Sequence, residues 1–230
     1  MSLLRLDHVV IAVRDLERAV ARYTDAGFTV TSGGRHPGRN TCNALVVFED
    51  GAYLELIAYS APSPDERWWR ELDVHGDGLV DFALLPLDLP AVVAQAQARG
   101  LTDITGPLPG GRIRPDGERV VWQTARQAHH DLPFLCADIT PRVLRVPEGE
   151  QRHHPNGASG IAEVTVAVAD VPASLARYFA FLGDDAVQNG DVMLEGACVR
   201  LVRDDDRARD QGPCGVRLRC PGAAGPLNLP

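Results

Sequence analysis

The sequence predicts an α+β fold built from tandem strand–helix–strand–strand–strand modules. Three segments of the 230-residue chain repeat one pattern, in which an apolar strand carries one polar residue and an Asp follows seven positions later. Each Asp precedes apolar residues at helical spacing, and a Gly closes the run 12 or 13 positions after the Asp. Such a repeat indicates one supersecondary unit copied along the chain. The three sets of polar residue, Asp and Gly are His8, Asp15 and Gly27; Asp81, Asp88 and Gly100; and Glu163, Asp170 and Gly183.

The first module is assigned to residues 1–60. Asp15 is a suitable helix N-cap, because its carboxylate accepts hydrogen bonds from backbone N–H groups at the positive end of the helix. Gly27 stands where a left-handed C-terminal cap is needed. The acidic-Gly turn at residues 49–51 predicts a hairpin between the last two strands. The expected elements are a strand at 6–13, a helix between Asp15 and Gly27, a short strand at 28–30, a polar loop at 32–41 and strands at 43–48 and 53–58.

The second module is expected over residues 75–140, and a shorter, partial third module over 155–210. Together the first two modules make one unit over residues 1–140. Residues 211–230 are expected to form a C-terminal tail, because the end of the chain is rich in Gly and Pro. The late strands expected in the second module are 118–124 and 132–138, and those in the third are 191–194 and 197–202.

Composition limits the classes of partner. The net charge of −8 and the isoelectric point near 5.3 argue against nucleic-acid binding, which needs a dense basic face. No membrane partner is expected, since no segment approaches the roughly 20 apolar residues of a membrane helix. The N-terminus lacks a signal-peptide pattern, and the odd number of cysteines contains no CxxC pair. We therefore expect reduced thiols, a cytoplasmic location and a small-molecule partner.

Several polar residues stand where apolar ones would be expected. The repeated strand position holds His8, Asp81 and Glu163, and all three residue types can bind a metal ion. Glu55 alternates into an apolar strand, so its carboxylate must be hydrated, paired or bound to a metal. The same pattern is also typical of polar residues that merely line a solvated cavity. The sequence pattern is compatible with both interpretations.

Motifs spread over nearly the whole chain accompany this module order. They are residues 6–10 (LDHVV), 34–38 (GRHPG), 43–45 (NAL), 51–57 (GAYLELI), 132–134 (LPF) and 154–161 (HPNGASGI). Together they resemble the vicinal oxygen chelate superfamily, and its glyoxalase-like branch most closely. The resemblance implies that the two complete modules curl a mixed sheet into a cup, with helices on the outer face. It also implies a site inside that cup.

The resemblance further implies metal ligands on the first and last strands of each module, namely His8, Glu55 and Asp81. The fourth position falls on Ala137, or on Asp138 if the strand is shifted by one residue. This oxygen-rich set favours Mn, Ni, Zn or Mg, with Fe less favoured. Arg200 on the last strand of the third module cannot bind a cation. The third module is therefore expected to be structural or to support a homodimer.

The function implied first is a metal-dependent lyase or isomerase, acting on a small oxygenated substrate that chelates the metal through two oxygens. Glu55, or His36 from the loop over the cup, would move a proton, and Arg39 would grip a substrate oxygen. An ordinary polar turn is the other interpretation of His36 and Arg39. The further candidates for substrate contact are Asn43, Trp68 and Trp69.

Two other functions fit the same fold. The first is a metal-free protein that binds a drug-like or aromatic molecule, favoured by the missing fourth ligand and by the two neighbouring tryptophans. The second is an extradiol-type dioxygenase, which uses two histidines and one carboxylate on Fe(II). The expected ligand set is one histidine short of that pattern.

Overall fold

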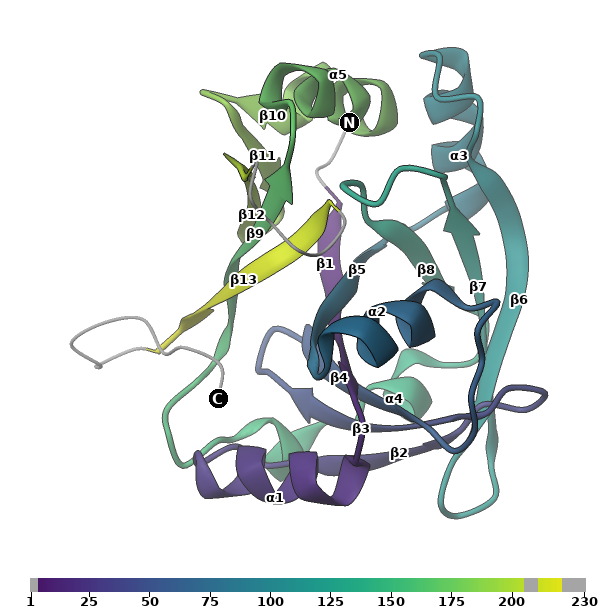
Figure 1. The fold of residues 1–230 in the computed structure, drawn as a ribbon, viewed down its shortest axis with the longest axis vertical. Helices are drawn as coiled ribbons and strands as arrows, with labels where there is room; N and C mark the ends of the chain where they lie inside the picture. Colours follow the sequence, from purple (N-terminus) through teal and green to yellow (C-terminus); the bar gives the residue numbers. More distant parts are fainter. Residues whose placement is uncertain (1–3, 205–210, 221–230) are drawn as a thin grey trace.

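The computed structural model describes residues 4–204 and 211–220, which form two sheets with helices on the outside (Figure 1). The larger sheet is a closed barrel with the strand order β1-β4-β3-β2-β6-β7-β8-β5. Its strands are β1 (Arg5–Val13), β2 (Thr31–Arg35), β3 (Thr41–Val47), β4 (Tyr53–Tyr59), β5 (Gly78–Leu85), β6 (Thr105–Ile113), β7 (Arg119–Arg126) and β8 (Phe134–Asp138).

The barrel joins the first two modules edge to edge. Within each module the first and last strands pair in parallel, β1 with β4 and β5 with β8. The two first strands, β1 and β5, pair antiparallel and link the modules. This mixed, curled sheet confirms the predicted α+β cup.

Two barrel strands differ from the sequence prediction. The strand expected at 28–30 is absent, and β2 lies instead within the segment expected to be a polar loop. At Gly34, with φ near +130°, a Cβ would collide with the carbonyl group of Ile113, so Gly is needed where β2 approaches β6. β6 itself contains two prolines and three glycines, which hide its strand character from any pattern of alternation.

The smaller sheet has the order β10-β11-β12-β9-β13. Its first four strands belong to the third module, which includes the very short strand β10. The tail prediction for 211–230 is wrong for residues 212–219, because β13 pairs antiparallel with β9 there. Residues 221–230 lie outside the described part of the chain. The strands are β9 (Gly160–Val168), β10 (Val187–Gln188), β11 (Asp191–Leu194), β12 (Ala197–Arg203) and β13 (Gly212–Arg219).

The three repeated helices begin where the sequence predicts. The carboxylates of Asp15, Asp88 and Asp170 each accept a hydrogen bond from the backbone N–H three residues later. Gly27, Gly100 and Gly183 have positive φ at the far ends. The helices are α1 (Leu16–Asp25), α3 (Leu89–Ala98) and α5 (Val171–Leu182); the segments between modules add α2 (Arg67–His75) and α4 (Arg142–Arg145).

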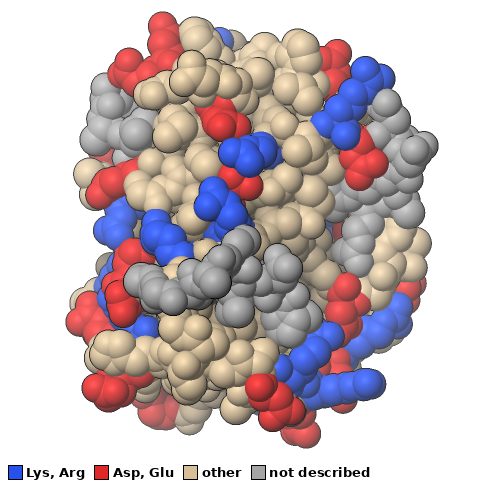
Figure 2. Space-filling view, turned by 90° about the vertical axis from the view of Figure 1, so that its left-hand side faces the viewer, with Lys and Arg blue, Asp and Glu red and all other residues tan. Residues whose placement is uncertain are grey.

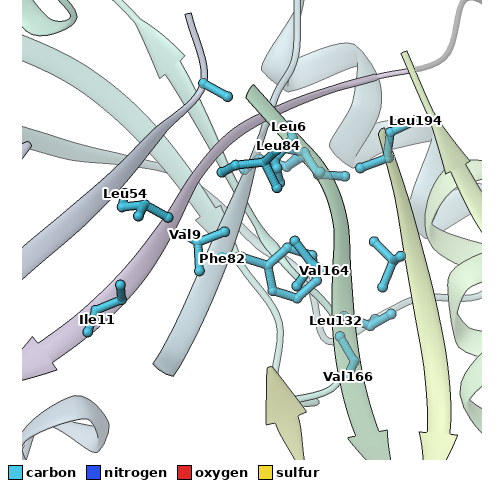
Figure 3. Close-up of a cluster of buried hydrophobic side chains, with 14 of the residues drawn as sticks. Leu6, Val9, Ile11, Leu54, Phe82, Leu84, Leu132, Val164, Val166 and Leu194 are labelled. Atoms are coloured by element: carbon cyan, nitrogen blue, oxygen red, sulfur yellow. The ribbon is translucent and has the colours of Figure 1, made fainter. Parts of the chain in front are cut away.

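The main core lies between the barrel and the smaller sheet. Val9, Phe82 and Leu84 point outward from the barrel and meet Val164 and Val166 of β9 (Figure 3). A second cluster lies on the inner side of the barrel, where α2 inserts Trp68 and Leu72 beside Phe134. The third module therefore supports the barrel from outside, and Trp68 and Leu72 of α2 complete the inner cluster.

We expect Asp15→Ala to lower the free energy of unfolding by about 1 kcal/mol, because the backbone N–H of Arg18 loses its capping acceptor. The matched control is Asp25→Ala at the other end of α1, where an acidic residue opposes the helix dipole. That control should be neutral or slightly stabilising. Urea titration of both variants tests the pair, and equal losses would contradict the capping role.

Candidate active site

A cavity of about 550 Å³ opens inside the barrel. Strands from both modules line it, with α2 and the loop that follows β2. Its aromatic wall consists of Tyr53, Trp68, Trp122 and Phe134. The polar groups in it include side chains from both modules and a histidine from the loop, so the closure of the barrel is what brings them together.

Glu55 of β4 lies at the centre of the polar wall and is only 7% exposed. Asn43 Nδ2 donates a hydrogen bond of 2.6 Å to Oε1. His8 Nε2 lies 3.5 Å from Oε2, and His36 Nε2 lies 3.9 Å from Oε1. Burial alone would raise the pKa of Glu55, but the two histidines, Asn43 and Arg112 outweigh it and lower the pKa. Glu55 is therefore a carboxylate at neutral pH.

His8 is held by Asp7, the residue before it. The register of β1 against β5 shifts between Leu6 and His8, so Asp7 is a bulged residue. This allows Asp7 Oδ2 to lie 2.7 Å from His8 Nδ1. Burial would raise the pKa of Asp7, but Arg145, His8 and Arg142 hold it well below its usual value. An ionised Asp7 only accepts, so His8 Nδ1 donates to it and the ring turns Nε2 towards Glu55.

Asp7 belongs to a buried ion network that sequence reasoning missed. Arg145 is 1% exposed and donates to both Asp7 oxygens, to Asp138 and to the hydroxyl of Tyr53. Arg142 donates to Asp7 Oδ1 at 2.7 Å and to Asp138 at 3.0 Å. An Asp inside an otherwise apolar strand was the available signal, but its partners come from α4, about 135 residues away. The network fixes the orientation of His8.

His36 extends the polar wall from the loop after β2. Its Nδ1 lies 2.9 Å from Thr41 Oγ1, and its Nε2 faces Glu55. Burial lowers the pKa of His36, and Arg112 and Arg39 add to this effect against the opposing influence of Glu55. The ring is therefore neutral at neutral pH. Arg39 also lines the cavity, and its guanidinium reaches Glu66 at 4.0 Å.

Asp81 is not brought to the same place as His8 and Glu55. In the β1–β5 register it lies opposite Val10, while His8 lies opposite Ala83. Its Oδ2 accepts from Arg67 at 2.5 Å and Trp68 Nε1 at 2.9 Å, and Arg126 lies 3.6 Å away. Asp81 does not line the cavity, and the described residues contain no group of three His, Cys, Asp or Glu side chains arranged to hold a metal.

The fourth expected ligand position is also different in the structure. Phe134 and Cys136 of β8 line the cavity, so strand alternation turns Ala137 to the outer face, where it packs against the main core. Asp138 follows on the inner face but is bound to Arg142 and Arg145. Burial raises the pKa of Cys136 to about 12, which keeps it a thiol.

Of the remaining candidates for substrate contact, two line the cavity and one does not. Trp68 and Asn43 line the cavity. Trp69 instead turns its ring towards Tyr59, with the two centroids 5.3 Å apart, and it does not line the cavity. A second tryptophan on the cavity wall is Trp122 of β7, which no sequence pattern singled out.

The third module uses its polar position for ion pairs. Glu163 is 5% exposed, and both Arg200 and Arg217 lie 3.1 Å from its Oε2. The face of the molecule that bears this sheet shows basic and acidic side chains intermingled (Figure 2). These contacts support a structural role for Glu163, and homodimerisation through this module stays a prediction. No helix in the described residues is long and apolar enough to cross a membrane.

Comparisons with known proteins give a family and a fold. A family model described as a glyoxalase-like domain matches residues 6–182. No curated protein matches the sequence. A hypothetical protein from Staphylococcus aureus superposes with a TM-score of 0.79 at 17% identity, covering 99% of this chain and 95% of that one.

Two further solved structures superpose with lower TM-scores. A xylose isomerase-like TIM barrel/4-hydroxyphenylpyruvate dioxygenase fusion protein gives a TM-score of 0.56 at 16% identity, over 95% of this chain and 36% of that one. Methylmalonyl-CoA epimerase from Mycobacterium tuberculosis gives 0.45 at 23% identity, over 62% of this chain and 93% of that one. At these identities the likeness concerns the fold.

Proposed function

Since the chain belongs to the glyoxalase-like domain family, we propose that it is an isomerase or lyase that moves a proton on a small oxygenated molecule. The family and the fold support a small-molecule enzyme or binder in general. The observation that favours an enzyme is the pair of buried Glu55 and half-buried His36 on the cavity wall, an ionised carboxylate beside a neutral imidazole. A neutral imidazole backed by a carboxylate is a suitable general base near pH 7.

In the proposed reaction His36 Nε2 removes a proton from a carbon next to a carbonyl group. The electron pair of that C–H bond moves to the carbonyl oxygen and leaves an enolate or enediolate. Glu55 stabilises the imidazolium that forms. In the isomerisation of a 2-hydroxy carbonyl compound, the imidazolium returns the proton to the former carbonyl carbon of the enediolate. The proton of the 2-hydroxyl group then passes to the other oxygen, so that the carbonyl and hydroxyl groups exchange places. Asn43 keeps Glu55 in place through its 2.6 Å hydrogen bond.

A divalent metal would polarise the carbonyl oxygen in such a reaction. The described residues do not supply the expected set of three ligands, because Asp81 is engaged by Arg67, Trp68 and Arg126. Of the expected set, His8 Nε2 and Glu55 remain beside the cavity. The proton transfer is therefore assigned to His36 and Glu55 alone.

We expect elemental analysis of protein purified without a metal-affinity tag to find well under one divalent metal ion per chain. The same result is expected after incubation with Mn, Ni, Zn, Mg or Fe(II), followed by gel filtration. The physical reason is that two protein ligands hold a metal more weakly than the usual three or four. Near-stoichiometric metal that disappears in His8→Ala would contradict this and restore the metal-dependent mechanism.

The proposed function is tested by proton exchange, which requires no knowledge of the product. The protein is incubated in D₂O with 2-oxo acids, 2-hydroxy acids and neutral 1,2-dicarbonyl compounds, and loss of the C–H signal next to the carbonyl is followed by NMR. Exchange with at least one compound, absent in His36→Gln, is the expected result. If compounds of the panel bind without exchange, the second candidate function, a binding protein, is favoured. The apolar aromatic wall of the cavity supports that candidate.

A further inference from the structure

The cavity carries an excess of positive charge. Five arginines line it, and Glu55 is the one carboxylate among the lining residues of the described chain. Three of these guanidiniums are paired with carboxylates. Arg145 pairs with Asp7 and Asp138, Arg126 with Asp81, and Arg39 with Glu66. The five are Arg39, Arg112, Arg119, Arg126 and Arg145.

Arg112 of β6 is different. It is 3% exposed, and within the described residues no carboxylate lies within 4.0 Å of its guanidinium. Its Nη2 donates to the carbonyl oxygen of Arg145 at 2.6 Å, and its Nε is buried without a hydrogen-bond partner. Glu55 acts on Arg112 only from beyond 4.0 Å. A buried cation without a direct ion pair is costly, so the place of Arg112 on a cavity wall points to a bound anion as its partner.

An aromatic surface lies beside this cation. Trp122 of β7 lies opposite Gly110 of β6, and a Cβ at that position would collide with the indole nitrogen. Gly110 therefore lets the indole lie against the backbone of β6, two residues from Arg112. The His36 ring meets the Trp122 ring edge-on, with centroids 6.1 Å apart. The unpaired guanidinium, the flat indole and the proposed base thus share one wall of the cavity.

We propose that Arg112 binds the carboxylate of the substrate and that Trp122 packs against a flat, apolar group on the same molecule. The substrate class is thus a small carboxylic acid with a planar substituent, such as an aromatic 2-oxo acid. A guanidinium matches a carboxylate through two parallel N–H donors, and an indole offers area to a planar group. This inference rests on the proposed function only in using the same cavity.

Binding of benzoylformate separates this inference from the chemistry, because the compound has no C–H next to its keto group. Calorimetry is expected to give a dissociation constant on the order of 1 mM or tighter. Benzoylformamide, of the same shape but neutral, should bind about 10- to 100-fold more weakly. Pyruvate, which lacks the ring, should bind several-fold more weakly. Because benzoylformate offers no proton to remove, a failure of proton transfer leaves this measurement intact.

Two variants assign the effect to Arg112. Arg112→Gln is expected to weaken benzoylformate binding about 10- to 100-fold and to abolish the preference over the amide. Arg112→Lys should recover part of it, since lysine keeps the charge but not the fork of donors. Arg114→Gln is the matched control, because Arg114 lies outside the cavity and is paired with Asp116 at 2.8 Å. Circular dichroism and thermal melting confirm that each variant is folded.

Several results would overturn the inference. Equal affinity for the acid and the amide would show that Arg112 does not bind the carboxylate. Unchanged benzoylformate affinity in both Arg112→Gln and Arg112→Lys, each shown to be folded, would show the same. Absence of saturable benzoylformate binding would do the same. Inorganic phosphate is the competing anion, and displacement of benzoylformate by phosphate at lower concentration than by benzoate would assign the site to phosphate esters instead. Equal affinity for pyruvate and benzoylformate would show that the site does not recognise a planar group.

Discussion

Asp7→Ala is expected to lower the free energy of unfolding by about 3–5 kcal/mol. Asp7 is fully buried and accepts from His8, Arg142 and Arg145 at distances of 2.7–3.0 Å. Removing it leaves Arg145 buried with Asp138 as its remaining carboxylate. Breaking a buried ion pair from one side costs more than the pair contributes, because the remaining charge has lost its compensation.

Urea unfolding of the parent protein and the variant measures this loss. Asp116→Ala is the control, since Asp116 pairs with the half-exposed Arg114 and is itself about half exposed. An exposed pair of that kind contributes at most about 1 kcal/mol. Replacing both Asp7 and Arg145 by apolar residues should recover part of the stability. A loss below about 1 kcal/mol for Asp7→Ala alone would refute the structural role of the network.

The same network predicts how stability depends on pH. The folded pKa of Asp7 lies well below its ordinary value, which is near 3.9 in the unfolded chain. Its contribution is therefore fully present above about pH 4 and is lost as the pH falls towards the folded pKa. The acid side of the stability curve should be less steep in Asp7→Ala than in the parent, and parallel curves would contradict this assignment.

The sequence predicts those features of the fold that depend on local chemistry. Asp15, Asp88 and Asp170 cap helices because a carboxylate there meets free backbone N–H groups whatever surrounds it. Strands β2, β6 and β13 were missed because glycine and proline carry no alternation of apolar and polar residues. In β6 these residues allow a close approach between strands, a property that appears only when the barrel is closed.

The candidate site shows the same division. Glu55 stands out in the sequence, and the structure places it on the cavity wall. The role expected of Asp81 required it to lie near His8, but the pairing of β1 with β5 places it opposite Val10, and no local pattern reveals that pairing. Arg67 and Arg126, which engage Asp81, come from α2 and from β7. Arg112 appeared in the sequence as one charged residue among many, and only its burial sets it apart.

His36→Gln is expected to lower the rate of proton exchange by about 100- to 10,000-fold, the range typical for loss of a positioned general base. Glutamine keeps the approximate size and polarity of the side chain but cannot take the proton at Nε2. Benzoylformate affinity should stay within a few-fold of the parent value. A loss of binding equal to the loss of exchange would assign His36 to substrate contact rather than to proton transfer.

The pH profile of exchange separates the base from its partner. Burial lowers the pKa of His36, so the rate should fall as the pH drops through a value below the ordinary 6.5. Glu55→Gln removes the influence that raises the pKa of His36 and leaves the opposing influences of burial, Arg112 and Arg39. The acid limb should therefore move to lower pH in Glu55→Gln while the maximal rate falls, because the imidazolium has lost its counter-charge. An acid limb that stays in place in Glu55→Gln would mean that the titrating base is neither His36 nor Glu55, and the proton would have to be assigned to His8 instead.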